Sequence, residues 1–407
     1  MSVLEQRIVS PAAPRLLGGL RGDGRPVPLA EHRARYGALP LELPPAELRD
    51  RVTASGLTGR GGAAFPTGLK LNSVLRSRAR PIVVANGTEG EPPSGKDKVL
   101  LAYAPHLVID GALLAARAVD ARQVVIATTS AVRAAVAHAI AERRREAGIK
   151  VQTAVVPDRF VAGEETALVQ FLNGGPALPT FTPPRPYESG VNGVSTVVLN
   201  VETLAHLALV ARFGAAWFRS VGTREEPGSA LVTISGAVRE PGVYEVELGD
   251  PFCALLDQAG ADPDAQAYLV GGYFGTWLSA ADARGAALSN ADLARFGASL
   301  GARAIVAFPR GFCGVVETAR IARYLADESA GQCGPCVHGL AAIAGDLAEL
   351  ARSSGQTDYG VLRRRLTQVA NRGACRHPDG AVALVASAMR VFAGEFERHL
   401  HGRSCAA

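Results

Sequence analysis

Residues 59–70 of the chain read Gly-Arg-Gly-Gly-Ala-Ala-Phe-Pro-Thr-Gly-Leu-Lys, with four glycines among the first ten positions. Glycine adopts positive φ angles and leaves backbone N–H groups uncovered, so a ligand can approach such a loop closely. With Arg60 at one end and Lys70 at the other, the loop suits a phosphate or another polyanion. Gly59, Gly61 and Ala64 also match the G-x-G-x-x-G/A spacing of nucleotide-binding loops. A glycine-rich surface loop without a ligand is the alternative for this stretch alone.

Strand-like and helix-like segments alternate on both sides of this loop, from about residue 51 to 222. We expect strands over 81–86, 123–128 and 151–156, and helices over 107–119 and 130–147, the second of them capped by Ser130. Strand–helix–strand alternation predicts a parallel sheet with helices on its faces. In such sheets ligands lie beyond the carboxyl ends of the strands.

The rest of the chain has a different pattern. Residues 1–50 are expected to form an extension with one short helix near 45–53. Around residue 228 two strands joined by a Pro-Gly turn begin a compact β-grasp-like module that extends to about 305. From 313 onward helical sequence predicts a small bundle, with helices over 314–326, 340–353, 361–370 and 380–400.

Composition limits the classes of protein to consider. A chain of 407 residues should form more than one domain. It contains no run of about 18 uncharged apolar residues, so no membrane span is expected, and its start lacks a secretion signal, which favours the cytoplasm. Six cysteines then indicate thiol or metal chemistry more than disulfides. The net charge of +5 favours an acidic protein partner over nucleic acid, because no long basic run is present.

Three polar motifs lie where the expected strands end or helices begin. Residues 86–91 read Asn-Gly-Thr-Glu-Gly-Glu, and their amide and carboxylates can bind sugar hydroxyls or ring nitrogens of a cofactor, with Lys96-Asp97 able to close the site. Gly163-Glu164-Glu165 opens an apolar helix. Asn200 fits an N-cap whose helix offers free N–H groups to a phosphate. The alternatives are an Asx turn with a solvated acidic loop, and carboxylates that only complement the helix dipole.

Cysteines between the expected C-terminal helices form a fourth motif. Cys333-Gly-Pro-Cys336 is followed about 40 residues later by Cys375. Three thiolates suit an iron–sulfur site, whereas zinc would need a fourth ligand such as His338 or His377. A thioredoxin-type dithiol is excluded, because the pair does not lie at a strand-to-helix junction. Cysteines that are simply buried are the remaining alternative, and Cys253, Cys313 and Cys405 are interpreted as core or tail residues.

In this order the motifs resemble the flavin- and NADH-binding F (51-kDa) subunit of respiratory complex I and its relatives in NAD-dependent hydrogenases and formate dehydrogenases. The matches lie at 59–70, 86–97, 163–168, 195–204 and 329–339, so the resemblance covers about 51–400. It implies a Rossmann-like α/β domain for flavin mononucleotide (FMN) and NADH at 51–225. It further implies a ubiquitin-like β-grasp (SLBB) domain at 226–308 and a helical bundle with a 4Fe-4S cluster at 309–407, after an N-terminal extension at 1–50.

The resemblance also implies roles for individual residues. The residues that would hold FMN are Gly59, Arg60, Gly61, Gly62, Gly68, Lys70, Asn86, Glu89, Gly163, Glu164, Asn200 and Thr203. Phe65 and Glu165 would lie on the NADH side, with Glu165 beside the nicotinamide as the catalytic residue. The iron ligands would be Cys333, Cys336 and Cys375. Hydride transfer needs the nicotinamide stacked on the flavin ring, which agrees with donors and a phosphate cradle at one place.

Departures from the family pattern are informative as well. The first cysteine of the family's cluster motif is Ala330 here, so a non-cysteine fourth ligand (His338 or His377), an open iron, a three-iron cluster and loss of the cluster all remain open. Thr88 replaces a carboxylate beside the flavin, and Leu71-Asn72-Ser73 lacks an aromatic that stacks on the NADH adenine. Leu199 stands where the family has the first asparagine of a pair.

The resulting hypothesis is an NADH dehydrogenase-type flavin and iron–sulfur oxidoreductase. A hydride would pass from NAD(P)H to the flavin, and single electrons would leave through the cluster to a ferredoxin-like protein, alone or within a larger redox complex. The reverse direction fits the sequence equally well. The alternative is a degenerate scaffold or docking subunit of a larger redox assembly, and a structural zinc site is a third interpretation of the cysteines.

Overall fold

The computed structural model describes residues 7–9, 14–77, 79–143, 148–352, 358–403 and 405. The chain divides into two compact units, which are described separately below. The first unit comprises Met1–Gly90, Ser94–Thr233 and Gly242–Asp250, and the second comprises Glu91–Pro93, Ile234–Pro241 and Pro251–Ala407. This division is coarser than the four expected segments, whose boundaries near 50, 225 and 308 stay predictions.

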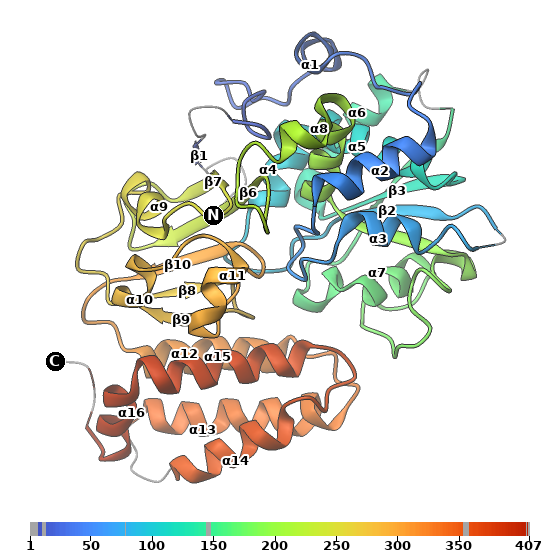
Figure 1. The fold of residues 1–407 in the computed structure, drawn as a ribbon. Helices are drawn as coiled ribbons and strands as arrows, with labels where there is room; N and C mark the ends of the chain where they lie inside the picture. Colours follow the sequence, from blue (N-terminus) through green and yellow to red (C-terminus); the bar gives the residue numbers. More distant parts are fainter. Residues whose placement is uncertain are drawn as a thin grey trace. The chain divides into compact units, whose positions relative to one another are not determined.

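The first unit is built on a parallel four-stranded sheet, as the alternating sequence predicted (Figure 1). Its strands are β2 (Ile82–Gly87), β3 (Gln123–Thr128), β4 (Lys150–Val155) and β5 (Thr196–Asn200). The strand order is β4-β3-β2-β5, and all three pairings are parallel. In the β2–β5 pair Asn86 lies opposite Asn200, so the two asparagines are neighbours at the carboxyl edge.

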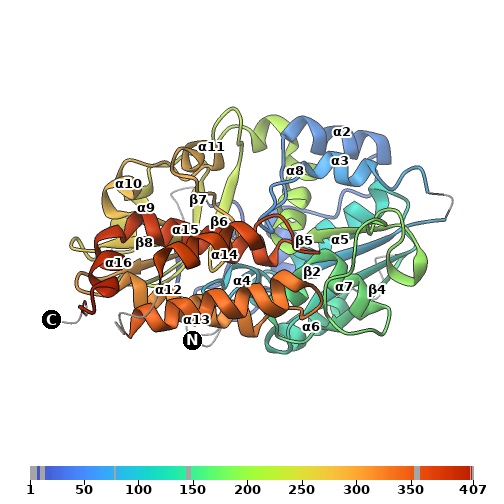
Figure 2. The same cartoon turned by 90° about the horizontal axis from the view of Figure 1, so that it is seen from below.

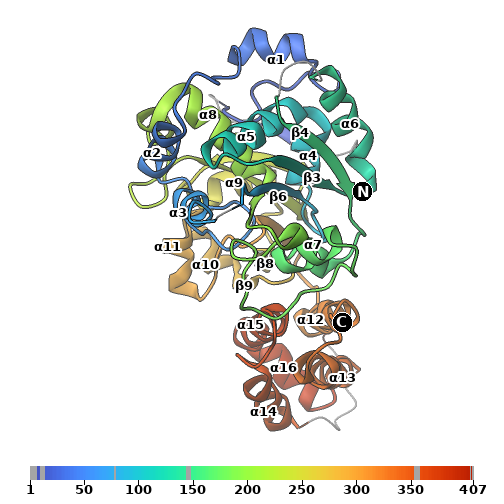
Figure 3. The same ribbon diagram turned by 90° about the vertical axis from the view of Figure 1, so that its right-hand side faces the viewer.

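Apolar side chains cover both faces of this sheet. On β2, Val83 and Ala85 pack into the larger core, whereas Ile82 and Val84 belong to a smaller core with Leu168. Successive strand residues point to opposite faces, so an all-apolar strand predicts a sheet buried on both sides. Figure 3 shows α5 (Pro105–Ala118) and α8 (Val201–Phe218) on one face and α7 (Glu165–Leu172) on the other.

The remaining helices of the first unit are α1 (Leu29–Tyr36), α2 (Pro45–Ser55), α3 (Thr67–Asn72), α4 (Lys96–Tyr103) and α6 (Arg133–Glu142). Three of them, α1, α3 and α4, were not expected. Helix α4 was not predicted because its first turn buries two charged residues, Lys96 and Asp97. Charged residues at buried positions interrupt the apolar periodicity by which a helix is recognised. The predicted cap is wrong: Ser130 lies in a 3₁₀ turn ahead of α6 and makes no capping hydrogen bond. Residues 144–147, the expected end of this helix, lie outside the described part.

Among the described residues no single helix is long and apolar enough to cross a membrane. Helices α4 and α5 together reach that length and composition, but the chain bends by 96° between them.

The other six described strands lie outside the parallel four-stranded sheet. In the first unit, β1 (Arg7–Val9) pairs in parallel with β7 (Gly242–Glu247). Strand β6 (Ser229–Gly236) begins in the first unit and ends in the second. In the second unit, β8 (Ala267–Val270) forms antiparallel pairs with β9 (Thr276–Ser279) and β10 (Ala304–Phe308).

Helices make up most of the second unit. They are α9 (Phe252–Gln258), α10 (Ala280–Arg284), α11 (Asn290–Leu293), α12 (Gly314–Asp327), α13 (Ala341–Ala351), α14 (Tyr359–Val369), α15 (His377–Val391) and α16 (Ala393–Leu400). Helix α12 packs against α13 and α15, and α13 packs against α14; Figure 2 shows these four running side by side.

The single helix expected over 380–400 is two helices, α15 and α16, that meet at Phe392. Phe392 has non-helical angles (φ −106°, ψ 29°). Its ring lies against Trp277, 5.0 Å between centroids, and so close to Gly314 that a Cβ there would come within 2.3 Å of it. Tertiary packing of one aromatic ring therefore overrides the local helical pattern.

Candidate functional site

The predicted motifs of the first unit meet at the carboxyl edge of the parallel sheet. Asn86 Nδ2 donates to the carbonyl oxygen of Gly163 at 2.8 Å. Asn200 Nδ2 donates to Asp97 Oδ2 at 2.7 Å, and its Oδ1 accepts from the backbone N–H of Glu202 at 3.0 Å, which confirms the predicted N-cap of α8. Each asparagine thus ties its own strand end to a second motif.

The glycine loop is held against the same edge. The backbone N–H of Arg60 donates to Thr203 Oγ1 at 2.8 Å, so the loop rests on the first turn of α8. A Cβ on Gly61 would lie 3.3 Å from Asn200 Cβ, tighter than an ordinary contact. Gly62 has a φ of 113°, in the region that favours glycine. Glycine at 62 is therefore favoured by its backbone conformation, and a side chain at 61 would crowd Asn200.

The Arg60 side chain does not have the role expected from the sequence. It is 1% exposed, and its guanidinium donates to the carbonyl oxygens of Pro227 and Ser229 at 3.3 and 3.1 Å. A guanidinium turned inward to backbone carbonyls cannot also act as the cation of an exposed phosphate loop. The expectation of a side-chain cation at this end of the loop is wrong, and only the Arg60 backbone remains part of it.

The other end of the loop keeps its cation at the surface. Lys70 Nζ forms a 2.8 Å ion pair with Glu165 Oε2, and both side chains are partly exposed. This pair joins the glycine loop to the start of α7. Phe65, predicted on the NADH side, is 52% exposed and offers an aromatic face to solvent.

The two acidic loops pack on each other through glycines. A Cβ on Gly163 would lie 2.8 Å from the carbonyl oxygen of Thr88, and one on Gly90 would lie 2.5 Å from that of Arg159. Asn86 Oδ1 accepts from the backbone N–H of Thr88 at 3.1 Å, which is the Asx turn considered above. Residues 86–90 and the segment 159–163 therefore pack against each other on one side of the candidate site.

Two predicted ligand residues act as helix caps. Glu89 accepts from the backbone N–H groups of Asp97 (3.2 Å) and Lys98 (3.0 Å) in the first turn of α4. Glu164 is the N-cap of α7 and accepts from the next helical N–H groups at 2.8 and 3.0 Å. Burial raises the pKa of Glu164, against the opposing effect of these bonds. The capping alternative therefore holds for Glu164. Glu89 is buried, so it does not lie in the solvated acidic loop that was the alternative for its motif. The roles of both carboxylates toward a cofactor stay predictions.

The sequence did not predict a buried cluster of charged side chains next to the carboxyl edge of the sheet. Lys96 Nζ lies 2.7 Å from Asp97 Oδ1 and 2.8 Å from Glu202 Oε2, and all three side chains are buried. Burial raises the pKa of Asp97 to about 6, with nearby Glu89 and Glu202 adding to the rise and Lys96 opposing it. The adjacent Lys96-Asp97 pair was visible in the sequence, but not its burial.

Three hydroxyl groups provide a test of whether a cofactor fits here. Thr67 Oγ1 in the glycine loop, and Thr128 Oγ1 and Thr129 Oγ1 at the carboxyl end of β3, are buried and have no hydrogen-bond partner among the described residues. Buried polar groups are nearly always satisfied in a complete structure. Unsatisfied hydroxyls in the loop and at the strand ends are consistent with a polar ligand at this edge, as FMN requires.

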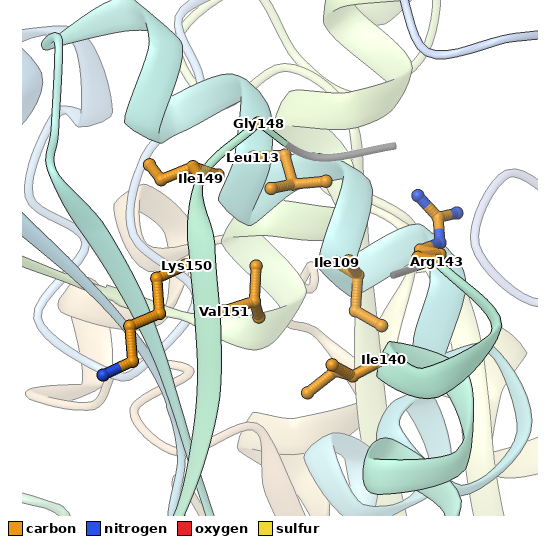
Figure 4. Close-up of a pocket in the computed structure, with 8 residues that line it drawn as sticks. All are labelled: Ile109, Leu113, Ile140, Arg143, Gly148, Ile149, Lys150 and Val151. Atoms are coloured by element: carbon orange, nitrogen blue, oxygen red, sulfur yellow. The ribbon is translucent and has the colours of Figure 1, made fainter. Parts of the chain in front are cut away.

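A cavity of about 360 Å³ lies elsewhere in the first unit (Figure 4). Most of its lining side chains are apolar. Lys150, at the start of β4, also lines the cavity. The predicted site residues lie at the opposite, carboxyl ends of the strands. This cavity is therefore not the candidate site.

The second unit contains the predicted cysteine motif, in the connection that follows α12. Cys336 is buried in a π-helical turn over Pro335–Leu340. Burial, followed by the neighbouring sulfurs of Cys333 and Cys375, raises the pKa of Cys336 to about 12. The Ala330 backbone amide acts in the other direction, so Ala330 also lies beside this sulfur. The sulfurs of Cys333 and Cys375 therefore lie near enough to Cys336 to affect its pKa.

The two histidines predicted as possible fourth ligands differ in their burial. His377 is 2% exposed, and its Nε2 donates to the carbonyl oxygen of Leu325 at 2.7 Å. His338 is exposed, whereas Cys336, two positions earlier in the same turn, is buried. The two side chains therefore point in different directions. The ligand set of the predicted iron–sulfur site, including its fourth ligand, stays a prediction.

Two family models match the regions of the chain that contain the two sets of predicted site residues. The family model described as the Nuo51 FMN-binding domain matches residues 52–209. The model described as the NADH-ubiquinone oxidoreductase-F iron-sulfur binding region matches residues 317–399. The chain is 31% identical over 383 residues to the F subunit of the NADH-quinone oxidoreductase of Streptomyces coelicolor, covering 90% of this chain and 85% of the relative. The corresponding Escherichia coli protein is 32% identical over 419 residues, with 96% and 94% covered.

Solved structures show the same likeness. A chain of the NAD+-reducing [NiFe]-hydrogenase in the air-oxidized state superposes with a TM-score of 0.83 at 30% identity, covering 92% of this chain and 67% of that one. The H2-reduced state gives a TM-score of 0.84 at 29% identity, with 97% and 68% covered. The fold resemblance therefore extends over nearly the whole chain.

Proposed function

Because the chain belongs to the family of NADH-quinone oxidoreductase F subunits, we propose that it moves electrons between NAD(P)H and a one-electron acceptor. With its FMN-binding and iron–sulfur regions it is an NADH dehydrogenase-type flavin iron–sulfur oxidoreductase. The observation that carries the proposal is the meeting of the glycine loop, Asn86 and Asn200 at one sheet edge. Bound FMN supplies the conversion between two-electron and one-electron transfer.

The residues at the edge have different tasks in this proposal. The uncovered backbone of Gly61 and Gly62 would lie along the phosphate, with Lys70 supplying positive charge. Glu165, paired with Lys70 at 2.8 Å, would face the nicotinamide, and the exposed ring of Phe65 would stack on the dinucleotide. The other residues of the FMN set, by backbone or side chain, are Gly59, Arg60, Gly68, Asn86, Glu89, Gly163, Glu164, Asn200 and Thr203.

The iron–sulfur cluster would be held by three thiolates. Cys333, Cys336 and Cys375 would be its protein ligands, and the iron nearest Ala330 would have no thiolate. The bound cluster supplies single-electron transfer. An iron without a cysteine ligand is more easily lost than the others, so the cluster should be sensitive to air and chelators.

The finer architecture and partners belong to the same proposal. Residues 51–225 would form the FMN and NADH domain, 226–308 the SLBB domain and 309–407 a helical bundle. A basic chain suits an acidic ferredoxin-like acceptor, and its relatives are subunits of NADH-quinone oxidoreductases and a chain of an NAD+-reducing hydrogenase. We therefore include a larger redox assembly among its partners. Six cysteines without a disulfide fit a cytoplasmic location.

An anaerobic visible spectrum, with flavin, iron and zinc analysis before and after addition of NADH, tests the proposal. We expect a flavin band and broad iron–sulfur absorbance that both bleach with NADH. Flavin that bleaches without iron would leave a simpler NADH-oxidising flavoprotein. Protein that is purified without air and contains neither flavin nor iron would contradict the proposal and favour the scaffold.

A further inference from the structure

A second cluster of metal-ligating side chains lies in the second unit, away from the cysteine motif. Cys313, His399 and Cys405 each offer one ligand atom, and these three atoms lie within 4.8 Å of one another. Cys313 Sγ lies 3.2 Å from His399 Nε2. No sequence pattern indicated this cluster, because the three residues come from the start of α12, from α16 and from the segment after it.

The hydrogen bonds of His399 determine which nitrogen faces the sulfurs. His399 is 1% exposed, and its Nδ1 lies 2.8 Å from the carbonyl oxygen of Leu350. A carbonyl oxygen can only accept, so Nδ1 carries the hydrogen and Nε2 of the neutral ring keeps a lone pair. That lone pair faces Cys313. A backbone carbonyl that holds the far nitrogen of a histidine is the usual support of a metal-ligating imidazole.

Both sulfurs lie near groups that favour a thiolate. Cys313 is the N-cap of α12, where the helix dipole favours negative charge. The Arg398 guanidinium donates to Cys405 Sγ at 3.6 Å. Without a metal, burial raises the pKa of Cys313 to about 11, with Cys405 adding to the rise and the backbone N–H groups of Val316 and Val315 opposing it. A cation bound between the sulfurs would reverse that balance, since a coordinated thiol loses its proton.

From this geometry we infer that Cys313, His399 and Cys405 form a binding site for a zinc ion. Two thiolates and one imidazole are a donor set that zinc binds tetrahedrally. Around such an ion the donor atoms are about 3.4–3.8 Å apart, so shifts of about 1 Å suffice. Cys313 and His399 also line a cavity of about 430 Å³, which leaves room for water as the fourth ligand.

This site is distinct from the predicted iron–sulfur site. Cys313 immediately precedes α12, and Cys333 and Cys336 follow its end. A helix of 14 residues is about 21 Å long, so the Cys313 cluster and the predicted iron–sulfur ligands lie at opposite ends of α12. The bound ion would link Cys405, which follows α16, to the start of α12.

Zinc uptake by the purified full chain tests the inference. Wild-type protein, Cys405→Ser and the control Cys253→Ser are reduced without air, freed of excess metal and equilibrated with buffered zinc. Because Cys333, Cys336 and Cys375 are present in all three proteins, any zinc they hold cancels in the comparison. We expect wild type and Cys253→Ser to bind one more zinc per chain than Cys405→Ser, with at least about tenfold weaker binding in the variant.

Cobalt supplies a second readout that a folding defect would not mimic. The difference spectrum between cobalt-loaded wild type and Cys405→Ser should show sulfur-to-cobalt charge transfer and the strong visible bands of a tetrahedral site. Zinc should also raise the melting temperature of wild type more than that of Cys405→Ser or His399→Gln. Equal zinc uptake by wild type and Cys405→Ser would overturn the inference, as would a Cys313–Cys405 disulfide whose reduction leads to no metal uptake.

Discussion

The candidate site of the first unit and the two cysteine clusters of the second are built in different ways. In the first unit, motifs from separate stretches converge because parallel strands end at one edge of the sheet. In the second unit, the clusters lie beyond the two ends of α12. At its far end a recognisable motif lacks one cysteine, and at its start three donors meet without any motif. A site at the edge of a parallel sheet can therefore be predicted from the sequence, because strand ends mark its residues. A site formed by packed helices cannot, when no motif marks its residues.

The largest effect is expected from the cluster that the motif marks. Cys336→Ser removes one of the three predicted thiol ligands and should leave essentially no iron in the purified protein, because two cysteines cannot hold a cluster that already lacks one. Iron analysis against Cys253→Ser, which should keep the wild-type content, measures this. A Cys336→Ser protein with wild-type iron would show that the motif is not the iron site.

Restoring the missing cysteine tests whether its absence limits the stability of the cluster. Ala330→Cys supplies a thiol at the position beside Cys336 where the family motif has one. We expect the iron–sulfur absorbance to survive a chelator or air several-fold longer than in wild type. Ser329→Cys, one position earlier, is the matched control and should not slow the loss. If both variants behave like wild type, the missing cysteine does not limit this cluster.

Particular residues show what sequence can and cannot foresee. The parallel strands and the Asn200 cap were predicted correctly, because both follow from local pattern. The inward turn of Arg60 was not, since its carbonyl partners lie more than 160 positions away. Helix α4 was hidden by the buried charge of Lys96, and the Cys313 cluster by distance along the chain. Local periodicity does not encode such long-range pairings.

A smaller effect is expected from the glycine loop. In Gly68→Ala the new Cβ would lie 2.3 Å from Thr53 Oγ1 and 3.1 Å from Thr53 Cα, so the loop must shift against α2. We expect unfolding to become easier by about 1–3 kcal/mol. FMN should also bind more weakly. Gly59→Ala is the control, since its nearest contact would be an ordinary 3.5 Å, and it should change stability by less than about 0.5 kcal/mol. Denaturant titration and flavin retention measure the two effects.

The smallest effect is expected in the pH dependence of stability, where two buried groups act in opposite directions. They are His106 in α5 and Asp97 in the buried charge cluster. Burial, with the charge of Arg143, lowers the pKa of His106 from 6.5 to about 4. Burial raises that of Asp97 from 3.8 to about 6. Between pH 6.5 and 4 the unfolded chain therefore binds a proton at His106 that the folded chain does not, and stability falls with acid. Between pH 6 and 3.8 the folded chain holds a proton on Asp97 that the unfolded chain lacks, which opposes the fall.

The two substitutions should separate these contributions. His106→Gln should flatten the acid loss of stability between pH 6.5 and 4, whereas Asp97→Asn should steepen it between pH 6 and 3.8, when each is compared with its own value at pH 7. His138→Gln, at an exposed position, should leave the profile unchanged. Urea titrations across this range measure the slopes. Equal slopes in all four proteins would mean that neither buried group titrates differently on folding, and that the charge cluster behind Asn200 does not oppose acid unfolding.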